Sequence, residues 1–209
     1  MAGWRERYAC LAAFDAGQAQ PLAGIDEAGR GPLAGPVVCA AVVLPPDGDP
    51  FVAGDSKQLS ARARAAALVE IKARALAWSV AVVGREEIDR DNILVATLAG
   101  MRRAWLQLAV SPALTLIDGN QLPAGVAPAQ TLVRGDGTSL AVACASVLAK
   151  ETRDALMIEL DARYPEYGFA QHKGYGTAAH LAALRARGPC PEHRRTFAPV
   201  SGMLAGTHA

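Results

Sequence analysis

Hydrophobic positions along the chain follow two patterns, and each pattern predicts one type of secondary structure. Continuous apolar runs that are rich in β-branched residues and bounded by glycine or proline predict buried strands. Such runs lie at residues 21–26, 37–44, 77–84, 113–117 and 129–135. Strong helix formers, or small and apolar residues at helical spacing, predict helices instead. These occupy residues 59–76, 85–109, 138–164 and 177–187, and the second of these stretches is long enough for one or two helices.

This order of elements predicts an α/β fold in which one mixed β-sheet is flanked by helices. The main domain is expected to span residues 1–163, with residues 1–20 as an N-terminal helical extension. The glycine, proline and basic content that follows predicts a small C-terminal helical lobe at residues 164–209. Its last residues, 201–209, are expected to form a disordered tail.

Charge is distributed unevenly along the chain. The 21 Lys and Arg residues against 20 Asp and Glu give a net charge of +1, which neither indicates nor excludes a nucleic-acid partner. Between Tyr167 and Pro199, however, there are five Lys or Arg and three His residues but only one acid, Glu192. The C-terminal lobe is therefore a candidate surface for an anionic partner, although a solvated basic face would have the same composition.

Other features of the composition bear on the compartment. No run of about 18 uncharged apolar residues is present, so no membrane-spanning helix is expected. The N-terminal residues include too few apolar positions for a secretory signal. The four cysteines are scattered without a CxxC or zinc-binding spacing, which predicts reduced thiols. We therefore expect a cytoplasmic protein.

Four acidic residues share one structural description, because each ends or directly follows a predicted strand. They are Asp26, Glu27, Asp118 and Asp136. Strand ends of an open sheet can converge on one crevice, and carboxylates gathered there repel one another unless cations neutralise them. Oxygen ligands suit Mg²⁺ or Mn²⁺ better than zinc. The pattern indicates a two-metal site for phosphoryl transfer, while any one of these acids taken alone could be an ordinary turn residue.

The segment GRGPLAG, residues 29–35, lies directly beside the first two acids. Its glycines do not match GxGxxG, and Pro32 and Pro36 would interrupt the helix that a dinucleotide-binding turn requires. No GxxxxGK phosphate loop is present either. Glycines on both sides of an arginine are more consistent with a backbone that approaches a ligand closely.

Seven sequence blocks, taken together, closely resemble the ribonuclease HII family of type 2 ribonucleases H, and they run in the family's order over residues 22–200. The blocks are GIDEAGRGPLAGPVV (24–38), DSKQLS (55–60), IDGN (117–120), GD (135–136), ASVLAKETRD (145–154), YPEYGFAQHKGYGT (164–177) and HRRTFAPV (193–200). The resemblance implies a ribonuclease H-like mixed sheet with flanking helices. It also implies endonucleolytic cleavage of the RNA strand in RNA/DNA hybrids, and nicking on the 5′ side of ribonucleotides embedded in duplex DNA.

The resemblance further implies a role for individual residues. The four acids would be the catalytic ligands of two Mg²⁺ or Mn²⁺ ions that bridge the scissile phosphate, and the products would carry 3′-hydroxyl and 5′-phosphate ends. We expect Asp26 to be the ligand shared by both ions, because its strand holds it deepest. The loop at 29–31 would read ribose 2′-hydroxyls through main-chain groups, and Tyr175 would stack on the deoxyribose that follows the ribonucleotide. The full set of substrate contacts implied in this way is Gly29, Arg30, Gly31, Lys57, Asn120, Ser139, Lys150, His172, Lys173 and Tyr175.

One position departs from the family pattern. A Lys or Arg is common two residues after the fourth acid, whereas this chain has Thr138. A phosphate contact would then be absent, or replaced by Arg134, and the neighbouring Ser139 would still offer a hydroxyl. This departure concerns affinity for the substrate rather than the chemistry.

Two other functions are compatible with the same acids. A two-metal exonuclease would also need four carboxylates, but it would not explain the loop at 29–31 or Tyr175. A non-catalytic module that binds RNA/DNA hybrids could keep the fold, yet the loss of an acid would be its signature and all four are present. For the enzyme we expect a monomer acting on nucleic acid, without a membrane partner.

Overall fold

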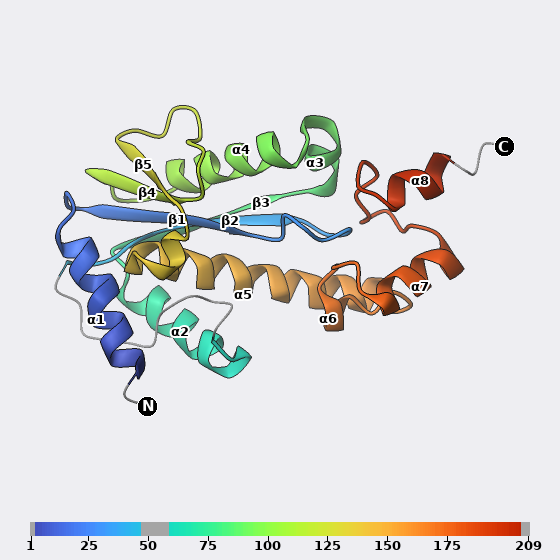
Figure 1. Cartoon of the computed structure of the whole chain (residues 1–209), viewed down its shortest axis with the longest axis horizontal. Helices are drawn as coiled ribbons and strands as arrows, with labels where there is room; N and C mark the ends of the chain where they lie inside the picture. The colour runs from blue at the N-terminus through green and yellow to red at the C-terminus, as the bar shows by residue number, and fades with distance from the viewer. Residues whose placement is uncertain (1–2, 47–58, 206–209) are drawn as a thin grey trace.

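The computed structural model describes residues 3–46 and 59–205, and its centre is a five-stranded sheet of order β3-β2-β1-β4-β5. Figure 1 shows this sheet between two layers of helices. The strands are β1 (Leu22–Ala28), β2 (Val37–Val43), β3 (Ala77–Val83), β4 (Leu114–Asp118) and β5 (Ala129–Leu132). β1, β2 and β3 pair in antiparallel fashion, whereas β1, β4 and β5 are parallel to one another. The predicted mixed sheet and all five predicted strands are confirmed.

The helices follow the predictions, with a few differences. They are α1 (Gly3–Ala16), α2 (Ala61–Arg74), α3 (Arg85–Asp91), α4 (Ile93–Leu106), α5 (Leu140–Arg163), α6 (Phe169–His172), α7 (Ala178–Arg187) and α8 (Val200–Ala205), with a 3₁₀ turn η1 at Gly135–Gly137. The stretch 85–109 forms two helices because Asn92, at a φ of 67°, ends α3, and its side chain caps α4. Ser60 caps α2 as predicted, by accepting from the N–H of Ala63.

Helix α5 is the main partner of the sheet on one face. Every residue from Leu140 to Ala149 is buried, and this half of the helix packs against β1 and β2. At Gly24 of β1, a Cβ atom would lie 2.1 Å from the carbonyl carbon of Ala141, so only glycine lets strand and helix approach this closely. Helices α3 and α4 cover the opposite face of the sheet (Figure 1).

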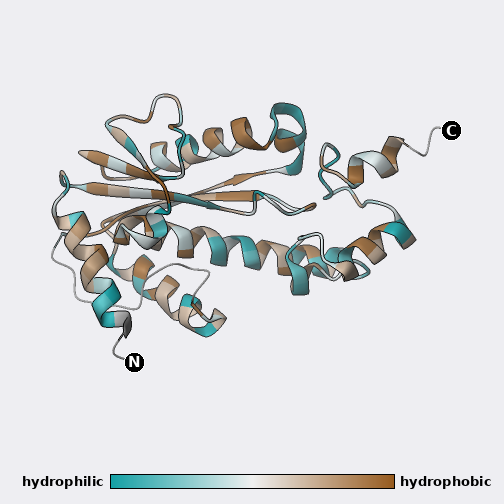
Figure 2. Ribbon diagram, in the orientation of Figure 1, coloured by the Kyte–Doolittle hydropathy of each residue, from teal (hydrophilic) through white to brown (hydrophobic). Residues whose placement is uncertain are grey.

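Most apolar side chains of the sheet are buried between these two layers. In Figure 2 the strands in the middle of the molecule are coloured as hydrophobic over most of their length. One apolar cluster lies between β2 and helices α1, α2 and α5, and a second between the sheet and α4. No helix among the described residues has the length and apolar character needed to cross a membrane.

The C-terminal lobe packs on the far end of α5. Its apolar cluster includes Phe169 and Leu184 from the lobe itself, Met157 from α5, and Leu33 and Ala34 from the loop after β1. The lobe therefore shares its core with the segment that joins β1 to β2.

The prediction of a disordered tail from residue 201 is wrong for its first residues. Residues 200–205 form α8, because Val200 is completely buried in the lobe's cluster, with Met203 and Leu204 packed beside it.

Candidate active site

Asp26 and Asp118 lie side by side where the pairing of the parallel strands β1 and β4 ends, although β1 itself continues to Ala28 beside β2. The last paired residues of β1 and β4 are Ile25 and Ile117, and each aspartate follows its isoleucine directly. Side chains at matched positions of neighbouring parallel strands point to the same face, and the strands lie about 4.8 Å apart. Asp26 is 4% exposed, and its carboxylate accepts from the N–H of Glu27 at 2.7 Å. The predicted convergence of these two acids is therefore present.

Glu27 points to the other face of the sheet because successive side chains of a strand alternate. It is only partly buried, and its carboxylate forms an ion pair with Arg30 at 3.4 Å. Two cavities meet at this pair: one of about 240 Å³ on the side of α5, and one of about 160 Å³ on the side of α4, where Asp118 and Asn120 line the wall. Glu27 thus lines both cavities.

Asp136 belongs to η1, which is bonded to the end of β4. The N–H of Gly135 donates to Oδ1 of Asp118 at 2.6 Å. This bond brings the turn that carries Asp136, a residue only 6% exposed, to the strand end that carries Asp118. Two strands, β1 and β4, and the turn η1 therefore place the four predicted acids in one region of the molecule.

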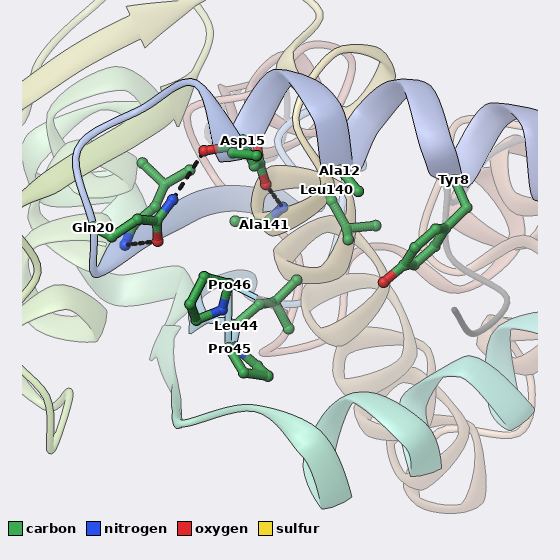
Figure 3. A pocket seen from close by; sticks show the side chains of 11 residues that line it. Tyr8, Ala12, Asp15, Gln20, Leu44, Pro45, Pro46, Leu140 and Ala141 are labelled. Carbon is green, nitrogen blue, oxygen red and sulfur yellow. Dashed lines mark hydrogen bonds between the residues drawn. The ribbon is translucent and has the colours of Figure 1, made fainter. Parts of the chain in front are cut away.

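The N-terminus of α5 is anchored by two side chains, and one of them corrects a prediction. Oδ2 of Asp15 in α1 accepts from the N–H of Ala141 at 2.8 Å (Figure 3). The hydroxyl of Ser139 is the N-cap, accepting from the N–H of Val142, and Ser139 has no exposed surface. The predicted substrate contact by Ser139 is therefore wrong, because its hydroxyl is engaged in capping the helix that follows Asp136.

The electrostatics of the acids suit a divalent cation. Burial raises the pKa of Asp26 well above its usual range, and the neighbouring charges of Glu27 and Asp118 raise it further. A bound cation would reverse this effect by favouring the ionised carboxylates. No three His, Cys, Asp or Glu side chains within residues 3–46 and 59–205 form a metal-holding group by themselves. Mg²⁺ typically takes one or two carboxylates and fills its other positions with waters and substrate phosphate, so the donor set at hand fits such an ion.

The larger cavity is formed by the loop after β1, by α5 and by the turn at Tyr175. Its wall consists of Glu27, Ala28, Gly29, Arg30, Gly31, Ser146, Lys150, Arg153 and Tyr175. Tyr175 is 47% exposed, and its ring faces Gly31, where an added Cβ would lie 3.6 Å from Cε1. The predicted loop and the predicted tyrosine thus form two sides of one hollow beside Glu27.

The other predicted substrate residues differ in availability. Lys150 lines the cavity and pairs with Asp154 at 2.7 Å. Nε2 of His172 contacts the carbonyl of Tyr167 at 2.7 Å, and its Nδ1 accepts from the N–H of Gly174, so both ring nitrogens already have protein partners. The ammonium of Lys173 donates to the carbonyl of Ala170.

Three further positions named in the predictions are Lys57, Arg134 and Thr138. Lys57 lies outside the residues that the structure describes. Arg134, the possible substitute for the missing basic residue, is exposed and adopts a left-handed conformation with a φ of 58°. The hydroxyl of Thr138 donates to the carbonyl of Arg134 at 3.3 Å, which holds this turn together.

Ser146 and Arg153 line the same cavity, and neither was predicted as a site residue. Ser146 forms a hydrogen bond with Asp26, which lowers the pKa of that carboxyl and so opposes the effect of burial. The signal was available in the block ASVLAKETRD, because Ser146, Lys150 and Arg153 stand four and three residues apart and therefore share one face of a helix.

Comparison with known proteins shows to which family this chain belongs. The family model for Ribonuclease HII matches residues 23–200. The chain is 57% identical to a ribonuclease HII from Delftia acidovorans over 88% of this chain and 78% of that protein, and 54% identical to one from Bordetella pertussis over 88% and 92%. The chain belongs to the ribonuclease HII family. It is accordingly a ribonuclease H, a divalent-metal-dependent endonuclease that acts on the RNA of RNA/DNA hybrids.

Solved structures agree on the fold. The ribonuclease H2 from Pyrococcus horikoshii OT3 superposes with a TM-score of 0.72 at 23% identity, covering 90% of this chain and 98% of that one. The ribonuclease HIII called Bst-RNase HIII, solved in complex with Mn²⁺, gives a TM-score of 0.67 at 20% identity, covering 93% of this chain and 72% of that one. The ribonuclease H-like sheet that the motifs predicted is therefore confirmed.

Proposed function

We propose that this ribonuclease nicks duplex DNA on the 5′ side of embedded ribonucleotides, as well as cutting hybrids, and that Asp26, Glu27, Asp118 and Asp136 are its catalytic acids. The observation that carries the proposal is the single cavity in which the loop at 29–31 and Tyr175 face each other beside Glu27. A reader of one ribonucleotide needs both a contact to the 2′-hydroxyl and a contact to its DNA neighbour. In this cavity the loop at 29–31 would make the contact to the 2′-hydroxyl, and Tyr175 would make the contact to the DNA neighbour.

The four acids would hold two divalent cations, Mg²⁺ or Mn²⁺. When bound, such ions supply the activation of a water for in-line attack on the phosphate and the stabilisation of the leaving 3′ oxygen. Asp26 is the best placed of the four to be shared between them, because Glu27 and Asp118 flank it from its own strand and from the next. Ser146 would fix the orientation of the Asp26 carboxylate.

The chain's own groups would recognise the substrate around this centre. Main-chain groups of Gly29, Arg30 and Gly31 would contact the ribose 2′-hydroxyl, which is the atom that distinguishes RNA from DNA. The ring of Tyr175 would stack on the following deoxyribose. Lys150, on the wall of the same cavity, would contact a phosphate, and Asn120 would border the substrate on the α4 side.

The remaining predicted contacts take lesser roles in this proposal. His172 would orient the turn that carries Tyr175, since both of its ring nitrogens bond to the chain around that turn. Lys57, Lys173 and Arg134 would add sequence-independent attraction to the duplex backbone.

We further propose that the enzyme works as a monomer in the cytoplasm, with a main domain at 1–163 and a substrate-binding lobe at 164–209. The free state of the four cysteines supports a reducing compartment. The basic excess of the lobe supports its contact with the duplex.

The test is the cleavage of an end-labelled DNA duplex that contains one ribonucleotide, with Mg²⁺, with Mn²⁺ and with a chelator. We expect a metal-dependent nick on the 5′ side of the ribonucleotide that leaves a 3′-hydroxyl, and no cleavage of the all-DNA duplex of the same sequence. Stepwise shortening from the ends would indicate an exonuclease. Binding without a cut would indicate a non-catalytic module.

A further inference from the structure

Two arginines with almost no exposed surface lie beneath the loop at 29–36. Arg153 of α5 is 1% exposed, and Arg194, after α7, is 0% exposed. Neither forms an ion pair with a carboxylate in the part of the chain that the structure describes. Burying a cation away from direct contact with a carboxylate is unfavourable, so the hydrogen bonds that hold these two guanidinium groups must offset that penalty.

The side chain of Arg194 donates four hydrogen bonds to three carbonyls of this loop. Nη2 donates to the carbonyls of Gly29 at 2.6 Å and Gly35 at 2.9 Å, Nη1 donates to that of Arg30 at 2.7 Å, and Nε donates to that of Gly35 at 3.1 Å. Burial lowers the pKa of Arg194 to about 9, which still leaves it charged at neutral pH. The loop is therefore held from beneath by charge-assisted bonds, which are stronger than neutral ones.

These bonds determine where the opposite side of the loop points. In a trans peptide the N–H and C=O groups point in opposite directions. Because the carbonyls of Gly29 and Arg30 point inward to Arg194, the N–H groups of Arg30 and Gly31 point away from it. Among residues 3–46 and 59–205, neither N–H group donates to a backbone carbonyl. Arg30 and Gly31 both line the larger cavity, between Glu27 and Tyr175.

Arg153 joins this loop to the turn that carries Tyr175. Its Nε donates to the carbonyl of Pro36 at 2.9 Å and its Nη2 to that of Ala34 at 3.3 Å, while its Nη1 donates to that of Lys173 at 3.0 Å. Gly29 packs directly on this side chain, since an added Cβ would lie 1.9 Å from Nε of Arg153. The two walls of the cavity thus share one buried anchor.

We infer that Arg194 and Arg153 are positioning residues for substrate selection: they aim the N–H groups of Arg30 and Gly31 at the ribose 2′-hydroxyl and set the distance from that loop to Tyr175. This inference rests on the function proposed above. In a long hybrid every nucleotide of the RNA strand carries a 2′-hydroxyl, so cleavage of the hybrid tolerates a displaced loop. A single embedded ribonucleotide presents one 2′-hydroxyl and one junction, so its cleavage depends on both walls being in place.

The experiment compares kcat/KM for a single-ribonucleotide duplex with kcat/KM for a long RNA/DNA hybrid, in the parent and in Arg194→Lys. Lysine cannot reproduce four bonds to three carbonyls, so the ratio of the two values should fall at least tenfold. Arg64→Lys is the matched control, because Arg64 is a partly buried arginine that pairs with Glu151 and Asp154 instead of with the loop. It should leave the ratio unchanged.

Equal losses on the two substrates would overturn the inference and leave the proposed function intact. Failure of the parent to nick the single-ribonucleotide duplex would overturn the proposed function itself.

A second measurement does not depend on whether Arg194→Lys folds. Amide NMR of Asp118→Asn should show fast-exchanging Arg30 and Gly31 N–H groups in the free protein. A ribonucleotide-containing duplex should protect them, and the all-DNA duplex should not. Protection in the free protein, or equal protection by the two duplexes, would contradict the geometry.

Discussion

Acidification should destabilise the C-terminal lobe through a buried pair of histidines. His180 and His193 are 0% and 1% exposed, and their Nε2 atoms lie 2.9 Å apart. Nδ1 of His193 accepts from the N–H of Cys190, and Nδ1 of His180 contacts the carbonyl of Tyr175 at 2.9 Å. Both rings are therefore neutral: His193 donates from Nε2 to His180, which in turn donates from Nδ1 to Tyr175. An additional proton on His193 would have to face the N–H of Cys190.

The pKa of His193 gives the size of this effect. Burial, aided by the neighbouring His180, lowers its pKa from 6.5 to about 4. The unfolded chain takes up a proton as the pH falls through 6.5, whereas the folded chain resists it down to about 4. The stabilisation is therefore complete above pH 6.5 and is lost as the pH falls between these two values. At about 1.4 kcal/mol per pH unit, the gap corresponds to about 3 kcal/mol.

Urea unfolding at several pH values between 7.5 and 4, followed by circular dichroism, measures this loss. The matched variant is His193→Gln, which keeps a polar side chain but cannot titrate. It is expected to have a lower free energy of unfolding at pH 7.5 and a pH dependence that is shallower by about 3 kcal/mol over the window. The carboxylates titrate in both proteins, so their contributions cancel in the comparison. Parallel curves for the parent and the variant would refute the assignment of a neutral, buried His193.

Three further substitutions test the packing and the corrected site. Gly24→Ala should destabilise the fold by about 3 kcal/mol, because its Cβ would lie 2.1 Å from the backbone of α5. The control Gly202→Ala has no atom within 4 Å of its Cβ and should leave the urea midpoint nearly unchanged. Equal urea midpoints for the two variants would contradict the close packing of Gly24 on α5. Ser139→Ala should lower the free energy of unfolding by about 1 kcal/mol through loss of the cap and leave KM unchanged, and a raised KM without a stability loss would restore its predicted contact with substrate. Tyr175→Ala should reduce cleavage at a single embedded ribonucleotide more than cleavage of a long hybrid, and equal losses would remove its role at the junction.

The sheet and its acids could be predicted because their signals are local. Continuous apolar runs identify buried strands, and an acid at the end of such a run lies at the edge of a sheet wherever the strand pairs. Ser139 shows the limit of a motif taken alone. A serine just before an apolar helix is an N-cap by position, and that local signal was the correct one.

Long-range contacts to the backbone left no such signal. Arg194 bonds to carbonyls 159 to 165 positions earlier in the chain, and a carbonyl is present at every residue. The four-residue helix α6 was missed for another reason, since it begins after Gly168 in a left-handed conformation and is too short to show a periodic pattern.

Single-turnover cleavage of an RNA/DNA hybrid by Asp118→Asn tests whether the four carboxylates hold the catalytic ions as proposed. The substitution removes a proposed metal ligand but keeps a side chain that can still accept from the N–H of Gly135. With saturating Mn²⁺, we expect the rate to fall by about 1,000-fold or more, because an ion in such a site contributes several kcal/mol, while the affinity for the hybrid stays near that of the parent. The control Asp91→Asn, at an exposed ion pair on α3, should be fully active. A rate for Asp118→Asn within about tenfold of the parent would contradict the proposed role of Asp118 as a ligand of the catalytic ions.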